Sequence, residues 1–170
     1  NTATMWAYPI LLEEGHCYSS SINPIRHDLY GMPNAPRVPF FPQPGGVVEI
    51  PLTTVRLAGR NWPCSGGGYF RLLPDALYRA GLGRVNREGM PGIFYFHPWE
   101  IDPGQPRIAN ASLKSRLRHY TNPSRMEAGL HALLRDFAWD RMDRVFADVI
   151  DRSAALTPSA HSAAAAASVF

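Results

Sequence analysis

One stretch of the chain reads Pro91-Gly92-Ile93-Phe94-Tyr95-Phe96-His97-Pro98. Its centre is a continuous apolar run, and Pro-Gly before it and Pro98 after it set its ends. A short apolar run with such bounds is typical of a strand that is buried on both faces, as in parallel sheets. His97 then stands at the carboxyl end of this strand, where ligands and catalytic groups gather in α/β sheets and barrels. The stretch therefore predicts an α/β fold with a candidate site at His97.

The segments around this strand alternate between helical and extended patterns. At the start of the chain, Trp6, Ile10 and Leu11 recur at helical spacing, with Thr4 placed to cap the helix and Gly15 placed to end it. The further elements that we expect are a strand over Cys17–Ile22, a loop with six prolines over Asn23–Gly46, extended segments over Val47–Leu52 and Thr53–Leu57, and helices over Ser112–Tyr120, Asn122–Phe137 and Asp140–Asp151.

One more helix is expected to begin at Pro74 and to run to about Leu82. Leu73, Leu77 and Ala80 mark its apolar face, and the glycines at positions 81 and 83 end or weaken it.

The composition indicates a globular chain. It has 170 residues, of which 45% are hydrophobic and 18% are charged, and this excludes collagen, coiled coil and disorder as the main state. No apolar window is long enough to predict a transmembrane segment. The net charge is +3, but the 16 Arg residues and the one Lys are spread along the chain without a recognisable module, so we expect no nucleic-acid binding. Two cysteines cannot form a disulfide framework.

The densest group of polar and aromatic side chains follows the predicted strand. It contains His97, Trp99, Glu100 and Asp102. An imidazole can donate or accept a proton near neutral pH, and a neighbouring carboxylate can orient it. The indole of Trp99 could stack on a sugar face. The competing interpretation is structural, with a hydrogen-bonded His at the end of a strand and Trp99 in the core.

Other kinds of site have little support in the sequence. The six histidines show no spacing that is typical of a metal site, so we predict no metal ligands within this chain. Three consecutive glycines, Gly66–Gly68, precede Tyr69 and Arg71 without the Lys-Ser/Thr of a phosphate loop, so they indicate close packing or backbone contact with a substrate. Tyr69 and Arg71 are our candidate substrate-binding residues here, together with Trp99.

Several longer motifs go beyond these single positions. They lie at Tyr18–Ile22, Pro24–Gly31, Glu49–Arg56, Gly66–Pro74, Phe94–Pro103, Arg116–Tyr120 and Leu133–Phe137. Together they resemble the C-terminal part of polysaccharide deacetylases of the NodB-homology superfamily. The similarity is greatest to the subgroup associated with exosortase-linked exopolysaccharide gene clusters, and it runs from about Trp6 to Phe146.

This resemblance implies a distorted (β/α) barrel whose later part occupies residues 1–106, a helical extension over 107–156 and an Ala- and Ser-rich tail over 157–170 that we expect to be disordered. It also implies metal-dependent removal of N- or O-acetyl groups from a polysaccharide substrate, with a divalent metal such as zinc, in the cytoplasm. The hydrophobic-x-His motif of the family matches Tyr95-Phe96-His97, so the resemblance assigns His97 as the general acid that protonates the departing amine.

The chain departs from the family pattern at two points. The family motifs that supply the metal ligands and the base do not occur in it, so we expect it to be a C-terminal portion that lacks the metal site and cannot deacetylate alone. Family members also commonly carry Asp where this chain has Ser19. The alternatives are a non-catalytic carbohydrate-binding or assembly module, which would use Trp99, Tyr69 and Trp62 as stacking surfaces, and a degenerate remnant.

Overall fold

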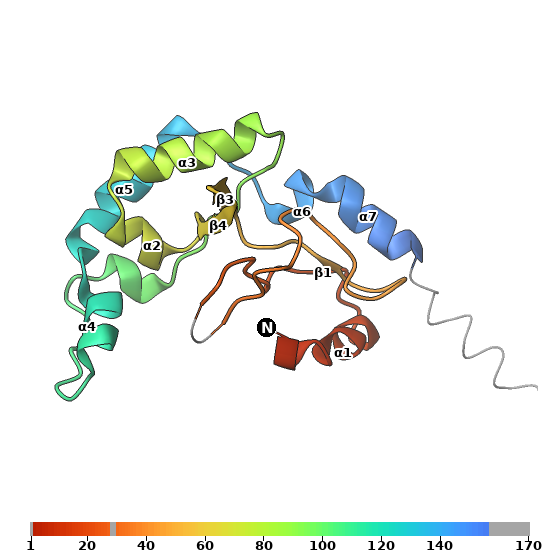
Figure 1. The fold of residues 1–170 in the computed structure, drawn as a ribbon, viewed down its shortest axis with the longest axis horizontal. Coiled ribbons are helices and arrows are strands. Elements are labelled where there is room, and N and C mark those ends of the chain that lie inside the picture. Colours follow the sequence, from red (N-terminus) through yellow and green to blue (C-terminus); the bar gives the residue numbers. More distant parts are fainter. Residues whose placement is uncertain (1, 28–29, 157–170) are drawn as a thin grey trace, which may run out of the picture. The chain divides into compact units, whose positions relative to one another are not determined.

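The computed structural model describes residues 2–27 and 30–156 (Figure 1). The described part is mixed helix and sheet, which confirms the coarse prediction of an α/β chain. It divides into two compact units, which are described separately below. The first combines the segment up to Pro51 with the segment from Asp140 onward, and the second is Leu52–Trp139. These bounds differ from the predicted boundary at residue 106, and the predicted tail at 157–170 lies outside the described residues.

The first unit begins with a short 3-10 helix η1 (Thr2–Thr4) and helix α1 (Ala7–Glu13). The helix ends as predicted at Gly15, whose φ of +80° suits glycine. There the N–H of Gly15 donates to the Leu12 carbonyl at 3.0 Å and the N–H of His16 donates to the Leu11 carbonyl at 2.9 Å, which is the Schellman arrangement. Trp6 and Ile10 lie on the exposed side of α1, and the buried side chain is Tyr8.

The remaining elements of this unit are two short parallel strands and two C-terminal helices. Strands β1 (Tyr18–Ser19) and β2 (Val48–Glu49) pair in register, with Ser19 opposite Glu49. The predicted proline-rich loop connects them. The helix expected over 140–151 is divided at Phe146 into α6 (Met142–Val145) and α7 (Ala147–Leu156). Helix α7 packs on β2, and its Ser153 hydroxyl donates to the Cys17 and Gly46 carbonyls at 3.1 and 2.8 Å.

The second unit begins with an antiparallel hairpin of β3 (Thr54–Leu57) and β4 (Arg60–Pro63). Its two-residue turn consists of Ala58 and Gly59, whose φ values of +48° and +74° fit the type I′ turn that matches the twist of a hairpin. Helices α2 (Gly67–Leu72) and α3 (Asp75–Arg87) follow, then the 3-10 helix η2 (Pro98–Ile101), α4 (Leu113–Tyr120) and α5 (Pro123–Asp136).

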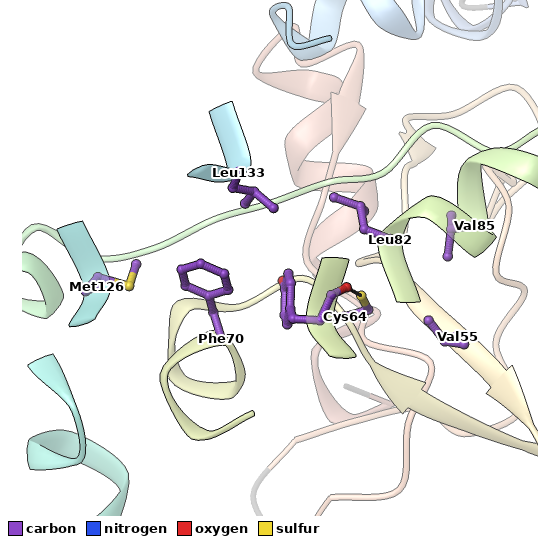
Figure 2. Close-up of a cluster of buried hydrophobic side chains, with 8 residues drawn as sticks. Val55, Cys64, Phe70, Leu82, Val85, Met126 and Leu133 are labelled. Atoms are coloured by element: carbon purple, nitrogen blue, oxygen red, sulfur yellow. Dashed lines mark hydrogen bonds between the residues drawn. The ribbon is translucent and has the colours of Figure 1, made fainter. Parts of the chain in front are cut away.

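The core of this unit joins the hairpin to α2, α3 and α5 (Figure 2). Helix α3 packs on β3, and α5 packs on α2 and η2. Burial raises the pKa of the Cys64 thiol to about 11, and burial also raises the pKa of Tyr78 well above its usual value. The buried side chains of this core are Val55, Cys64, Phe70, Tyr78, Leu82, Val85, Met126 and Leu133.

Helix α3 differs from its prediction in length and in orientation. It continues past both glycines to Arg87, and its buried side chains are Tyr78, Leu82 and Val85, whereas Leu77 is exposed. The reason lies at Gly81, where a Cβ would stand 3.2 Å from Val55 Cγ2 and 3.3 Å from Cys64 Sγ. This glycine therefore allows the helix to approach the hairpin closely, and it does not end the helix.

The predicted strand over residues 93–97 is the main correction to the fold. Only Tyr95 forms a bridge, parallel to Gly66, with its N–H donating to the Ser65 carbonyl and its carbonyl accepting from the Gly67 N–H, both at 2.9 Å. Ile93 is buried, but Phe96 is 36% exposed and His97 is exposed. The ladder stops after one bridge because helix α2 begins at Gly67 and turns the partner backbone away. The segment is extended but is not a strand buried on both faces.

Within the described residues, strands form two two-stranded sheets, one parallel and one antiparallel. None of the described helices is long and apolar enough to cross a membrane.

Candidate functional site

The second unit gathers two histidines around one tryptophan. His97 directly precedes η2, Trp99 lies in η2, and His119 lies in the last turn of α4. The rings of His97 and Trp99 stack at 5.7 Å between centroids and 8° between planes, and the ring of His119 lies 5.0 Å from that of Trp99. Both imidazoles are exposed, while Trp99 is half-buried between them. We call His97, Trp99 and His119 the His–Trp–His cluster.

A buried ion pair holds the segment that carries this cluster. The Arg71 Nη2 group donates to Glu100 Oε1 at 2.9 Å, and the two side chains are 1% and 3% exposed. The second oxygen of Glu100 accepts the backbone N–H of His97 at 2.8 Å. The guanidinium carbon of Arg71 also lies 5.6 Å from the Trp99 ring centroid, within reach of a cation–π contact. Glu100 therefore positions the backbone of His97, and it does not orient the imidazole as the sequence interpretation assumed.

The Arg71 guanidinium also caps the C-terminal end of α4. Its Nη1 donates to the carbonyls of His119 and Thr121 at 3.1 and 2.8 Å, and its Nη2 donates to the carbonyl of Arg118 at 3.2 Å. These carbonyls have no partner within the helix and carry the negative end of its dipole, so a buried cation there is favourable. One guanidinium thus ties η2 to α4 and brings Trp99 and His119 together.

The three glycines allow α2 to approach Glu100. A Cβ on Gly67 would lie 2.5 Å from Glu100 Oε2 and 2.9 Å from Phe96 Cβ, and a Cβ on Gly66 would lie 2.9 Å from the Tyr95 hydroxyl. The predicted close packing is therefore present, and its partner is the segment that carries His97. Gly68 is less restricted, because the nearest atom to its Cβ would be Glu100 Oε1 at 4.0 Å.

The four residues that the sequence singled out occupy different environments. His97 and Trp99 stack on each other, with His97 toward solvent. Tyr69 is half-buried in α2. Arg71 is buried, and its contacts through Nη1 and Nη2 are with protein groups, so it positions the cluster. The assignment of these residues to catalysis or substrate binding stays a prediction.

Sequence reasoning did not find His119 as a member of the site. It lies 20 residues beyond Trp99 and belongs to a different helix, so no local spacing connects the two. The available signal was the Arg116–Tyr120 segment, which contains His119 and is one of the longer motifs of the sequence.

A second polar location lies in the first unit around the buried Glu49. Its carboxylate accepts hydrogen bonds from the Tyr8 hydroxyl at 2.6 Å and from the N–H groups of Ser21 and Ile22 at 2.8 and 2.6 Å. Burial, and then the hydrogen bond to Glu49, raise the pKa of Tyr8 to about 12. Ser19 is 3.1 Å from Ser21 between hydroxyl oxygens. A cavity of about 270 Å³ adjoins Tyr8, Ser19 and Ser21. The carboxylate holds the backbone after β1 in place.

No group of three or more His, Cys, Asp or Glu side chains within the described ranges could hold a metal ion. The donors of the His–Trp–His cluster are two imidazoles separated by an indole, and Glu100 is committed to Arg71 and to the His97 backbone. The described residues therefore do not fit a catalytic metal centre of the usual three-ligand kind.

The comparison with protein families identifies the chain. Residues 20–147 match the family described as Domain of unknown function (DUF3473). The chain belongs to this family. The match includes η2 and α4, and so the whole His–Trp–His cluster of this DUF3473 protein. Neither a curated protein nor a solved structure matches the chain.

Proposed function

We propose that this DUF3473 chain contributes to the deacetylation of an N- or O-acetylated polysaccharide in exopolysaccharide synthesis. In this proposal residues 1–106 form the later part of a NodB-like distorted (β/α) barrel, residues 107–156 form a helical extension, and the protein acts in the cytoplasm. The proposal rests on the motif resemblance. The structural observation that carries it is the exposed imidazole of His97, stacked on Trp99 beside a second exposed imidazole.

The chemistry of the cluster suits proton transfer at a sugar. An exposed imidazolium can donate a proton to the amine nitrogen that leaves when an acetyl group is removed, and such general acid catalysis contributes about 10²–10⁴-fold in rate. The Glu100 carboxylate accepts the backbone N–H of His97 and so fixes the backbone there, and the stacked Trp99 ring limits the positions of the imidazole. An aromatic ring beside the donor also offers an apolar surface to a sugar ring.

The metal expected for this chemistry does not have a site among the described residues, so no step of the proposal passes through it. In the polysaccharide deacetylases that the motifs resemble, a divalent metal activates water. The proposal places the ligands of this metal outside the described residues. We expect calorimetric titration of the chain with Zn²⁺ to show no tight one-to-one binding. Such binding at histidine side chains would contradict this assignment.

A non-catalytic carbohydrate-binding module is the second candidate, and the exposure of Trp62 on β4 favours it. The two candidates differ in where a glycan binds. In an NMR titration with an N-acetylglucosamine oligosaccharide, the deacetylase proposal predicts shifts at His97, Trp99 and His119 and loss of binding in Trp99→Ala. Shifts confined to Trp62 and Tyr69, with binding lost in Trp62→Ala, would support the module and contradict the proposal.

A further inference from the structure

Helix α4 has its apolar side facing away from the unit that it belongs to. At about 100° per residue, Leu113, Leu117 and Tyr120 fall within about 60° of one another around the helix axis. Leu113 is 72% exposed and Leu117 is 57% exposed, while Tyr120 is half-buried. The opposite side carries His119, which contacts Trp99. An amphipathic helix in a globular unit normally buries its apolar side, so this orientation calls for a partner.

A neighbouring loop extends the same apolar surface. The N–H of Ile108 donates to the Tyr120 hydroxyl at 3.0 Å, and the Ile108 residue is 70% exposed. The guanidinium of Arg107 lies 5.5 Å from the centroid of the Tyr120 ring. Ile108 is therefore held beside the C-terminal end of the stripe. We call Ile108, Leu113, Leu117 and Tyr120 the α4 stripe; Figure 1 shows α4 at the end of its unit opposite the β3–β4 hairpin.

Basic side chains border this stripe on both sides. Lys114 and Arg116 are exposed and fall on opposite sides of it around the helix axis, and Arg107 lies next to Ile108. Between Asp102 and Glu127 the sequence has five basic residues and no acidic residue. Of these five residues, Lys114 and Arg116 on α4 and Arg107 in the preceding loop border the stripe.

We propose that the α4 stripe docks on an anionic lipid surface. Exposed aliphatic side chains bordered by Lys and Arg are the arrangement with which interfacial helices enter the boundary between head groups and acyl chains. A second copy of this chain would oppose cation to cation on this surface, and a polyanion alone would leave the leucines exposed to water. The proposal does not depend on the deacetylase assignment.

Docking would place the His–Trp–His cluster close to the membrane. His119 lies on the far side of the same helix from the stripe, about one helix diameter of 10 Å away. The cluster would then face away from the lipid while remaining near it. A polymer that is made or modified at a membrane is therefore the class of substrate that this geometry suits.

The test is flotation of the full chain with lipid vesicles. We expect binding to phosphatidylcholine vesicles with about 30% phosphatidylglycerol, weak binding to pure phosphatidylcholine, and release by about 0.5 M NaCl. The variant L113S/L117S should bind at least about tenfold more weakly, because two buried leucines are lost. The variant K114Q/R116Q should lose about fivefold for each cation removed.

Leu134 and Arg135 provide matched controls, because both are exposed on α5 and lie outside the stripe. The variant L134S/R135Q should bind like the original chain, and circular dichroism should show that all variants fold. The proposal is overturned if the chain does not bind anionic vesicles or binds neutral vesicles equally well. It is also overturned if the stripe variants bind normally, or if the leucines mediate self-association or the cations bind DNA without any vesicle binding.

Discussion

Replacing Glu100 by Gln tests most directly whether the buried Arg71–Glu100 pair holds the His–Trp–His cluster in place. The change keeps the size of the side chain and removes its charge. Both carboxylate oxygens of Glu100 face donors, the Nη2 group of Arg71 at 2.9 Å and the backbone N–H of His97 at 2.8 Å. An amide has only one acceptor oxygen, so in either orientation its NH₂ group faces another donor. Arg71 is also left as a buried cation without its counter-ion.

The expected cost follows from this burial. Breaking a buried ion pair by removing one partner costs about 3–5 kcal/mol. For a unit of this size, each kcal/mol corresponds to about 4–8 °C, so the melting temperature should fall by about 12 °C or more. Denaturant unfolding followed by circular dichroism measures the change in unfolding free energy directly.

The matched control is Glu88→Gln, since Glu88 also pairs with an arginine. Its contact with Arg84 Nε is 3.0 Å long, but the two side chains are 31% and 47% exposed, so the loss should stay below about 1 kcal/mol. A loss below about 1 kcal/mol for Glu100→Gln as well would refute the claim that the buried pair holds the cluster together.

Two further predictions concern the packing of the second unit. Gly67→Ala should destabilise the chain by about 1–3 kcal/mol, because its Cβ would overlap Glu100 Oε2, whereas Gly68→Ala should cost less than about 1 kcal/mol; equal effects in denaturant unfolding would contradict this. Burial on folding raises the pKa of the Cys64 thiol from 9.0 to about 11, because it disfavours the thiolate. The stability that the protonated thiol contributes should therefore be complete below about pH 9 and be lost as the pH rises toward 11. At pH 8, iodoacetamide should therefore modify the exposed Cys17 quickly and Cys64 only after unfolding, and rapid labelling of both would contradict the burial of Cys64.

Local signals in the sequence predicted the elements that depend on local chemistry. Gly15 ends α1 because a left-handed residue is needed there, and Asn122 and Pro123 mark the start of α5. Strand β3 was predicted as the extended segment Thr53–Leu57. Its pairing with β4 was missed because the turn is Ala58-Gly59, and alanine with a positive φ is not a usual turn signal. The buried face of α3 was misjudged because Gly81, which has no side chain, forms the contact with the hairpin.

The apolar run at 93–97 shows what a hydrophobic pattern alone cannot predict. Its composition fits a buried strand, but the number of hydrogen-bonded neighbours depends on the path of the partner chain, and helix α2 takes that partner away after one bridge. For the site, the sequence could single out His97 and Trp99. It could not show that Arg71 binds the carbonyls at the end of α4, because that contact spans about 50 residues and involves backbone atoms.

The role of His97 as a proton donor is the central claim, and one kinetic measurement tests it. In a deacetylase that carries this domain together with a metal site, His97→Ala should lower kcat by about 10²–10⁴-fold. The pH–rate profile of this variant should also differ from that of the original enzyme. His131, which is exposed on α5, is the matched control, and His131→Ala should leave the profile unchanged. An unaltered kcat and pH–rate profile in His97→Ala would contradict the account.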